Sequence, residues 1–389
     1  MKRLDVVVIG GGIVGCAMAY FLTRAGLKTL VVERDGIAGA SSGASMGHLI
    51  TLYGPDELYQ LSRRSLELWK MIHREVGGFP LRETGCLWMG ETEEDRPLLE
   101  NLHSAVAGHG DQGVLVDQGE LLRMEPALAR DLIGGFFYPA DAVTFPMQAA
   151  GALLGAAIEG GAEVMPHCAV RQIRRSSQGA IEGVITSSGT IETDNLVIAA
   201  GVWSPEITEM VGLPRAPIFP RRGDLAITMC QHQPIKHQLV EVAYLRAAMG
   251  ETLDPESGEP DPGACAVNLQ PQSNGTLLIG SSRQFSGMDL RVNRRLLEQS
   301  MTRAARFLPG VGGLNLVRTW AGLRPYTKDK TPIIGPVAEV PGLFIASGHE
   351  GLGITLSTGS AELIAQAIVG ETTRQSLTPF LLDRFSEAG

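Results

Sequence analysis

The chain has 389 residues, with 33 Lys and Arg against 42 Asp and Glu, and a formal net charge of -9. An acidic chain without a long basic run argues against binding to nucleic acid or to an anionic membrane surface. The length predicts two domains. Five scattered cysteines with no C-x-x-C pair predict neither a disulfide framework nor a zinc or iron–sulfur site, and they favour a reducing compartment. No apolar run reaches about 18 residues, so no transmembrane helix is expected.

The first 33 residues predict a strand, a helix and a second strand, over residues 4–9, 13–25 and 29–32. In the first turn Gly10, Gly12 and Gly15 fit G-x-G-x-x-G, which allows a tight turn, close approach of a pyrophosphate and close helix packing. Glu33 follows about 20 residues on, where a carboxylate can bind ribose hydroxyls and disfavours a 2′-phosphate. The alternatives are a signal peptide, which the glycines interrupt, and a glycine-rich turn without a ligand.

The remaining elements are predicted in chain order. A polar loop covers 41–47, and helices cover 56–76, 91–107 and 146–160. Residues 80–145 are otherwise irregular, with short strands such as "GCLWMG". Paired strands are expected at 163–173 and 180–186, a buried strand at 195–203, and antiparallel strands over 216–285 with a hairpin at 273–275. Residues 250–264 are predicted to be a loop, either a solvated connection or a lid.

The C-terminal quarter repeats the first pattern. A helix at 290–307 is followed by a strand at 343–346, the glycine loop "SGHEGLG" and a helix at 354–369. Two strand–glycine loop–helix units in one chain suggest that both ends of an extended cofactor are held at one sheet.

Five segments together resemble the D-amino acid oxidase superfamily of FAD enzymes, the glycine/sarcosine/proline oxidase and dehydrogenase group. They are "VVVIGGGIVG" with Glu33, "GASSGASMGHL", "VIAAGVWS", "TWAGLRPYTKDKTPIIGP" and "FIASGHEGLGIT". The resemblance covers essentially the whole chain. Within the group, "SMGHLI", "LLIGSSRQF" and "GHEGLGI" look most like bacterial D-hydroxyproline or D-proline dehydrogenase subunits, and the glycine oxidases come next.

The resemblance implies an α/β fold with two domains. A Rossmann-like FAD-binding domain of the glutathione-reductase type would comprise residues 1–80, 145–215 and 315–389. A second, mainly antiparallel β domain that binds the substrate would comprise residues 81–144 and 216–314. The enzyme would oxidise the C–N bond of a small amino acid to an imine, by hydride transfer to flavin N5.

The resemblance also assigns cofactor contacts. The pyrophosphate would lie at the first glycine loop, the ribose at Glu33 and Arg34, and the adenine at the backbone of Val170. The expected FAD-binding residues are Gly10, Gly12, Ile13, Val14, Gly15, Glu33, Arg34, Ser41, Ser42, Ser45, Met46, Gly47, His48, Val170, Ala200, Gly201, Gly348, His349, Glu350, Gly351, Leu352, Gly353 and Ile354. The last loop would direct a helix N-terminus at the reduced flavin, whose negative charge it stabilises.

Arg324, in "AGLRP", is the predicted clamp for the substrate carboxylate, because a guanidinium makes two parallel hydrogen bonds to it. The alternative is a structural arginine in a buried ion pair. His48 and His349 would contact FAD or substrate, or instead bind backbone. Tyr244 is a weaker candidate for the carboxylate, and Glu350 could instead be an outward-facing loop residue.

Two departures from related enzymes bear on the chemistry. No cysteine lies near Arg324 where the sarcosine oxidases carry one that is linked to flavin, so FAD is expected to be non-covalent. Leu278 stands where those oxidases carry an oxygen-activating lysine, which favours a dehydrogenase. The alternatives are an oxidase that forms hydrogen peroxide and a non-catalytic FAD-binding subunit; Arg324 argues against the latter.

The expected partners are a small amino acid and an electron acceptor, either a quinone or another subunit, with neither nucleic acid nor a metal. The protein is expected in the cytoplasm, free or peripheral to the inner face of the membrane.

Overall fold

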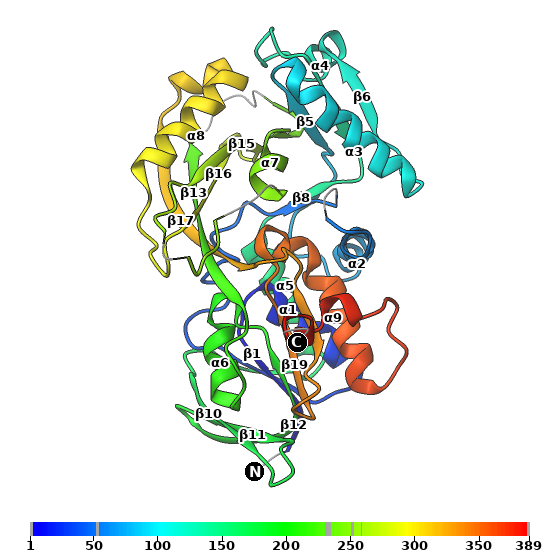
Figure 1. The fold of residues 1–389 in the computed structure, drawn as a ribbon. Coiled ribbons are helices and arrows are strands. Elements are labelled where there is room, and N and C mark those ends of the chain that lie inside the picture. Colours follow the sequence, from blue (N-terminus) through cyan, green and yellow to red (C-terminus); the bar gives the residue numbers. More distant parts are fainter. Residues whose placement is uncertain (1–2, 52–53, 230–234, 250–252, 258, 387–389) are drawn as a thin grey trace. The chain divides into compact units, whose positions relative to one another are not determined.

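The computed structural model describes residues 3–51, 54–229, 235–249, 253–257 and 259–386. The chain divides into two compact units. Figure 1 colours the chain along its sequence, from the N-terminus to the C-terminus. Unit 1 comprises Met1–Leu81, Thr144–Pro220 and Arg324–Gly389, and unit 2 comprises Arg82–Val143 and Arg221–Leu323. The boundaries fall within the strands β4 (Leu81–Arg82), β8 (Ala142–Thr144), β13 (Ile218–Thr228) and β17 (Leu316–Thr327).

Unit 1 is built on an eight-stranded sheet with the order β10-β11-β12-β1-β2-β9, to which β19 and β18 are added beside β12. Its strands are β1 (Leu4–Ile9), β2 (Thr29–Val32), β9 (Glu163–Met165), β10 (Val170–Arg175), β11 (Ile181–Thr186), β12 (Gly189–Ile198), β18 (Ile333–Pro336) and β19 (Leu343–Ser347). The strands β2, β1, β12 and β19 run parallel, whereas β10, β11 and β18 pair antiparallel with their neighbours. Apart from Asp5, β1 is apolar on both faces, as a central parallel strand should be.

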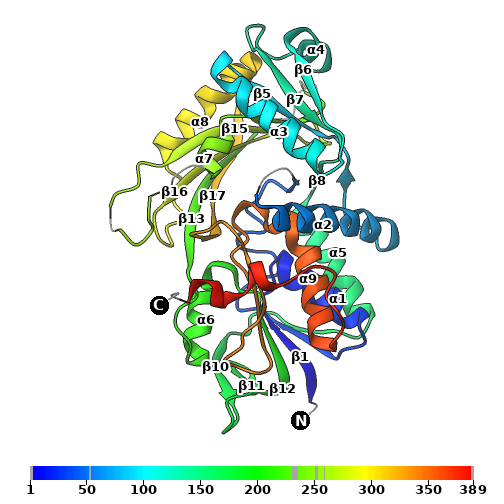
Figure 2. The same ribbon diagram turned by 45° about the vertical axis from the view of Figure 1, so that its right-hand side comes forward.

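The helices of unit 1 bury apolar faces around this sheet. They are α1 (Ile13–Arg24), α2 (Asp56–Glu75), α5 (Pro146–Glu159), α6 (Ser204–Val211) and α9 (Gly353–Val369), with short 3₁₀ turns at η2 (Gly201–Trp203), η4 (Glu350–Leu352), η5 (Thr378–Phe380) and η6 (Leu382–Phe385). α1 packs against both α5 and α9, and α2 packs on α9, as Figure 2 shows. α9 is therefore enclosed by other helices along much of its length.

Unit 2 holds a second eight-stranded sheet with the order β17-β13-β16-β15-β14-β5-β7-β6. Its remaining strands are β5 (Cys86–Gly90), β6 (Val114–Asp117), β7 (Gly134–Tyr138), β14 (Gln238–Glu241), β15 (Ala264–Pro271) and β16 (Leu277–Phe285). Most neighbours pair antiparallel, and β14 and β5 are parallel. The antiparallel pairing of β15 with β16 confirms the predicted hairpin.

The helices of unit 2 are α3 (Arg96–Gly108), α4 (Gln118–Met124), α7 (Tyr244–Met249) and α8 (Arg294–Phe307), with 3₁₀ turns at η1 (Glu93–Asp95) and η3 (Pro309–Gly313). One core packs α4 and α8 against a face of the sheet, through Leu121 and Phe307 and the strand residues Leu87, Leu269 and Ile279. Side chains alternate between the two faces of a strand, so the strand residues that alternate with these core residues lie on the opposite face of the sheet.

Two predictions about secondary structure are wrong. Residues 163–173 form two strands instead of one, because the chain turns at Pro166 and His167: β9 pairs with β2, and β10 pairs with β11. The region from 80 to 145 is regular, with β5, β7 and β6 side by side in one sheet. The predicted loop over 250–264 lies partly outside the described residues, since 250–252 and 258 are not described, and β15 begins at Ala264.

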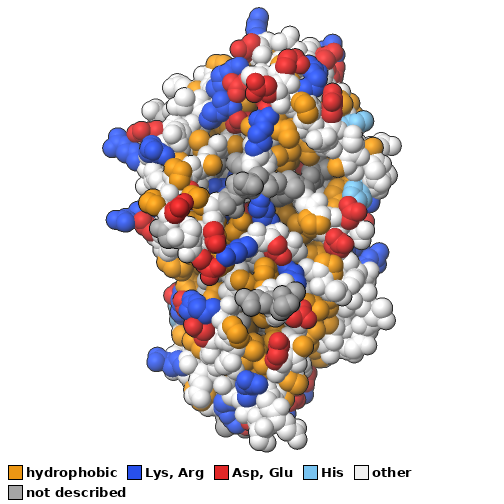
Figure 3. Space-filling model, in the orientation of Figure 1, with side chains coloured by type: hydrophobic (Ala, Val, Ile, Leu, Met, Phe, Trp, Pro, Cys, Tyr) orange, Lys and Arg blue, Asp and Glu red, His pale blue; other side chains and the backbone are white. Residues whose placement is uncertain are grey.

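Among the described residues one stretch, Glu350–Val369, has the length and apolar composition of a candidate membrane span, and 67% of its window is buried inside the fold. It consists of η4 and α9, which is the core helix that packs on α1 and α2. Acidic and basic side chains are mixed over the face seen in Figure 3.

Candidate functional site

Four parallel strands end at the same edge of the unit 1 sheet. In the order β2, β1, β12 and β19 they are hydrogen-bonded neighbours, so their carboxyl ends lie side by side. The segments that follow these strands bring together Glu33, Gly10, Ala200 and Gly348, in that order across the sheet. In open α/β sheets this edge is where ligands bind.

The first glycine loop meets two different demands. Gly10 has φ +112°, and a Cβ there would lie 2.5 Å from the carbonyl oxygen of Ala199. A Cβ at Gly15 would lie 1.8 Å from the carbonyl oxygen of Gly10. Packing of the protein itself therefore requires both glycines. A Cβ at Gly12, by contrast, would come within 4 Å of Ser42 Oγ, at 3.3 Å, and of no other atom in the described part of the chain beyond its chain neighbours. Gly12 borders space in front of the α1 N-terminus that a side chain would fill.

Two polar side chains flank that helix start. Ser42 is nearly buried, and its Oγ accepts a hydrogen bond from the Ile13 amide at 2.9 Å. The Glu33 carboxylate accepts hydrogen bonds from the amides of Gly11 at 2.6 Å and Asp35 at 2.7 Å. Each carboxylate oxygen has further lone pairs for a hydroxyl donor. Anions are favoured at a helix N-terminus, so this corner combines an anion site with an acceptor for hydroxyls.

The loop after β12 carries an aromatic ring and an open glycine. The exposed Arg34 guanidinium lies 4.8 Å from the centroid of the Trp203 ring, which links the ends of β2 and β12. Gly201 has φ +55°, and among the described residues no atom outside its two chain neighbours lies within 4 Å of the place of a Cβ. Its carbonyl accepts a hydrogen bond from Ser347 Oγ at 3.0 Å. Val170, the predicted adenine contact, begins β10 and is half-buried.

The loop after β19 differs from the loop after β12, because its glycine leaves no room for a Cβ. Gly348 has φ +79°, and a Cβ there would lie 2.7 Å from Thr327 Cγ2 at the end of β17. The next residue, His349, is buried, and its Nε2 lies 3.0 Å from Ser360 Oγ in α9. Burial lowers the pKa of His349 to about 4, so the ring is neutral at neutral pH. The structure thus gives this imidazole a partner within the helix that follows it.

Arg324 and Glu350 face each other within unit 1. Arg324 Nε lies 4.0 Å from Glu350 Oε1, and the side chains are 18% and 12% exposed. The alternative of an outward-facing Glu350 is therefore wrong. The second carboxylate oxygen, Oε2, accepts a hydrogen bond from the Gly351 amide. The pair is compatible with both interpretations of Arg324, a structural ion pair and a clamp for the carboxylate of a ligand.

The other predicted residues lie in two places. Gly47 has φ +90°, and a Cβ there would meet the Thr144 carbonyl at 2.1 Å. His48 follows in the short strand β3 (His48–Leu49), and its carbonyl accepts a hydrogen bond from Thr355 Oγ1 in α9 at 3.2 Å. Ser41, Ser45 and Met46 belong to the turn that precedes β3. Tyr244 is in unit 2, where it is buried and begins α7.

The sequence reasoning missed a polar face on the unit 2 sheet. Trp88, Asn268 and Gln270 are at most 3% exposed, and they alternate with core residues, so they share the face opposite α8. In the part of the chain that the structure describes, Trp88 Nε1, Asn268 Oδ1 and Gln270 Oε1 have no hydrogen-bond partner. The Tyr244 ring packs 6.4 Å from that of Trp88, and the Arg283 guanidinium lies 4.1 Å from the Tyr244 ring. The alternation of polar and apolar residues in "CAVNLQP" was a signal for this face.

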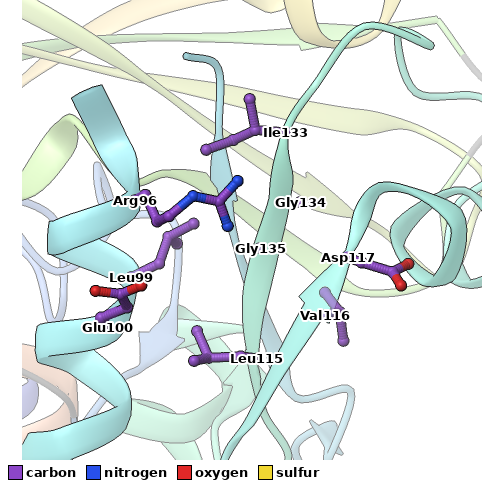
Figure 4. Close-up of a pocket in the computed structure, with 9 residues that line it drawn as sticks. All are labelled: Arg96, Leu99, Glu100, Leu115, Val116, Asp117, Ile133, Gly134 and Gly135. Atoms are coloured by element: carbon purple, nitrogen blue, oxygen red, sulfur yellow. The ribbon is translucent and has the colours of Figure 1, made fainter. Parts of the chain in front are cut away.

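A pocket elsewhere in unit 2 carries none of the predicted site residues. It lies between α3 and the strands β6 and β7, and Arg96, Glu100, Leu115 and Ile133 are among its lining residues (Figure 4). Arg96 pairs with Glu93, 2.7 Å away at the start of the same helix region. Nothing in this lining adds to the site at the strand ends.

Residues 5–367 match the family described as DAO, FAD dependent oxidoreductase. The chain belongs to this family. Its cofactor is FAD, and the protein is an FAD-dependent oxidoreductase with the α/β fold expected from the sequence. FAD supplies two-electron redox chemistry when bound. The space beside Gly12, the helix N-terminus and the Glu33 carboxylate fit its pyrophosphate and ribose.

Comparison with curated proteins and solved structures gives full-length similarity. The hydrogen cyanide synthase subunit HcnC of Pseudomonas aeruginosa is 28% identical, with 99% of this chain and 97% of that protein aligned. A glycine oxidase of Geobacillus kaustophilus is 29% identical, with 98% and 97% aligned. The crystal structure of glycine oxidase from the same organism superposes with a TM-score of 0.87 at 27% identity, covering 100% of both chains. An L-proline dehydrogenase from P. horikoshii has the same fold, with a TM-score of 0.89 at 24% identity over 99% of this chain and 98% of that one.

Proposed function

We propose that the protein oxidises the C–N bond of a small amino acid to an imine, with FAD as the immediate electron acceptor. The observation that carries this proposal is the charge arrangement at Arg324, a mostly buried guanidinium in the unit that holds the FAD-binding loops. A guanidinium fork recognises a carboxylate in a fixed plane, which orients the Cα–H bond of the ligand. The glycine oxidase described above, a curated relative whose name states an amino acid substrate, supports the class of substrate.

We assign the FAD contacts to the four strand ends of unit 1. The pyrophosphate lies at the α1 N-terminus, beside Gly12 and Ser42, and the ribose binds Glu33. The isoalloxazine ring takes the turn 45–48 and the loop 348–354. The contacts that support this assignment are the space at Gly12, the open side of Gly201 and the hydrogen bonds that hold Ser42 and Glu33. The cofactor is held without a covalent bond.

We assign recognition of the substrate side chain to unit 2. The buried polar atoms of Trp88, Asn268 and Gln270 can bind the polar groups of a ligand, and Tyr244 is adjacent to Trp88. The family resemblance favours D-proline or D-hydroxyproline as substrate, whereas the names of the relatives favour glycine. The two are distinguished by a substrate panel.

The electron acceptor is a quinone or a partner protein in this proposal. Leu278 supports it: this buried strand residue offers no charge at the place that the resemblance gives to an oxygen-activating lysine. The competing function is an oxidase that produces hydrogen peroxide, which the glycine oxidase relatives favour.

An anaerobic titration tests the proposal. Purified holoenzyme is mixed with glycine, sarcosine and the D- and L-forms of proline, hydroxyproline and alanine, and the flavin absorbance is followed. We expect one or more of these amino acids to bleach the flavin, and air to restore the colour slowly. Rapid recovery in air would instead identify an oxidase. If no amino acid bleaches a flavin that dithionite reduces, the proposed function is wrong.

A further inference from the structure

The backbone at Glu350 holds a charged side chain in an unusual conformation. Glu350 has φ +47°, in the left-handed region that residues with a Cβ rarely occupy. Gly351 follows it directly, and a glycine at position 350 would adopt the same conformation without steric cost. Strained conformations of this kind concentrate at functional sites, where the side chain is needed at that place.

The Glu350 carboxylate is oriented by two contacts. Oε2 accepts the hydrogen bond from the Gly351 amide, which fixes the carboxylate against its own loop. Oε1 lies 4.0 Å from Arg324 Nε. That distance exceeds a hydrogen bond, so the contact is an ion pair between separated groups. The two segments run close to each other, since a Cβ at Gly348 would lie 2.7 Å from Thr327 Cγ2.

Opposite charges placed in this way select among carboxylates. A simple carboxylate bound to Arg324 would lie close to the negative charge of Glu350, and this repulsion is poorly screened because both side chains are mostly buried. An α-amino acid carries a positive ammonium next to its carboxylate. It can therefore place one charge against Arg324 and the other against Glu350.

We propose that Glu350 binds the amino group of the substrate and, with Arg324, makes the site selective for zwitterionic α-amino acids over carboxylic acids without an amino group. This inference rests on the proposed function and deepens it. Arg324 provides affinity for every carboxylate, whereas Glu350 provides the preference for the amino group.

The test compares two ligands of the same shape in holoenzyme with Glu350→Gln. One is the amino acid that bleaches the flavin fastest, whose dissociation constant comes from the saturation of the anaerobic reduction rate. The other is its des-amino carboxylic acid, measured as a competitive inhibitor of that reduction. In the variant, we expect the dissociation constant of the amino acid to rise about 10- to 100-fold, the worth of a hydrogen bond to a charged group. The inhibition constant of the carboxylic acid should stay the same or fall.

Three further variants complete the test. Glu350→Asp should recover part of the preference, because it keeps the charge. Arg324→Lys should weaken both ligands together. Glu362→Gln is the matched control, since Glu362 pairs with Arg64 at 2.6 Å in the middle of α9, and it should leave both constants unchanged.

Several outcomes would overturn the inference. If Glu350→Gln weakens both ligands equally, or neither, the carboxylate does not recognise the amino group. If the variant loses FAD, the carboxylate serves the cofactor loop instead. If no amino acid reduces wild-type flavin, the proposed function fails and this inference fails with it; a normal amino acid reduction in wild type with an unchanged preference in the variant overturns this inference alone.

Discussion

In the proposed function the two units use different chemistry for recognition. At the strand ends of unit 1, the binding groups are mainly backbone: glycines that leave space, and the amides of a helix N-terminus. On the unit 2 sheet, the groups with unmet hydrogen-bonding capacity within the described residues include side chains, among them those of Trp88, Asn268 and Gln270. A cofactor common to a whole family can be bound by backbone geometry, whereas a substrate that varies between relatives requires side chains that can be exchanged.

The loop after β19 in unit 1 combines backbone and side-chain groups. It has the glycine that its turn requires, at Gly348, and it also carries Glu350 toward Arg324. Backbone and side chains therefore meet at one strand end of unit 1. The predictions below separate these contributions.

The largest effect is expected from Gly12→Val. A valine side chain would occupy the space beside the α1 N-terminus and exclude the pyrophosphate, so the purified variant should be colourless. Wild-type protein should be yellow, and acid precipitation should release its FAD into the supernatant. Gly151→Val is the matched control, because outside its own helix and chain neighbours no atom of the described residues lies within 4 Å of a Cβ at this exposed helical position. Full flavin in Gly12→Val would contradict the backbone site, and flavin in the pellet would show a covalent link.

Arg324→Ala should retain FAD and lose catalysis. Removal of one partner of a buried charged pair costs about 3–5 kcal/mol, which corresponds to a loss of roughly two to three and a half decades in kcat/KM. Arg324→Lys should recover only part, because an ammonium cannot bind both carboxylate oxygens in plane. Flavin content and reduction rates are measured together.

The same two measurements separate the interpretations of Arg324. Near-normal flavin reduction with full flavin content in Arg324→Ala would show that Arg324 is not the clamp for the substrate carboxylate. Loss of flavin or of solubility would instead support a structural ion pair with Glu350.

His349 should make the stability of the holoenzyme depend on pH. The pKa of this buried imidazole is lowered to about 4, so the unfolded chain binds a proton near pH 6.5 before the native state does. Stability is therefore complete above pH 6.5 and falls as the pH drops toward 4, by about 3 kcal/mol from this group. The difference in unfolding free energy between wild type and His349→Asn should change across this range. The exposed His167→Asn is the control; parallel curves for wild type and His349→Asn would contradict the assignment.

The sequence predicted the backbone elements that carry the proposed cofactor site. A tight strand–helix turn leaves few options other than glycine, so the motif at Gly10, Gly12 and Gly15 identified the loop, and the loop at 347–353 followed by analogy. The elements around both loops form as expected. The break after β9 was missed although Pro166 marks it, because the apolar pattern continues beyond the turn.

Side-chain geometry could not be predicted in the same way. Asn268 and Gln270 alternate with apolar residues as they would on a solvated strand face, and only the packing of the folded chain shows that they are buried. Arg324 and Glu350 likewise face each other from segments that are far apart in the sequence, and no local pattern encodes that pairing. β7 was missed because Gly134 and Gly135 lower the strand propensity of its sequence. The folded chain nevertheless leaves no room for a side chain at position 134, since a Cβ at Gly134 would lie 2.4 Å from the Val116 carbonyl oxygen.

The smallest effect is expected from Gln270→Leu. The sign of the change in unfolding free energy distinguishes a ligand-binding role of Gln270 from a structural one. A buried carbonyl oxygen without a partner costs about 1–3 kcal/mol, and leucine removes that cost. If the polar face of unit 2 serves a ligand, the variant should unfold at higher free energy yet bind substrate more weakly, with KM raised about 2- to 10-fold by the loss of one hydrogen bond.

Gln284→Leu provides the contrast. The Gln284 amide donates to the Asp261 carbonyl at 2.7 Å, and its oxygen accepts from Asn293 Nδ2 at 3.0 Å, so this leucine should destabilise the protein. Denaturant unfolding of both variants beside steady-state kinetics makes the comparison. Replacement of a residue that only supports the fold should lower the stability of the protein, as we expect for Gln284. A destabilised Gln270→Leu with unchanged KM would therefore show that the polar face of unit 2 is structural, and would remove the difference between the two units from which these predictions start.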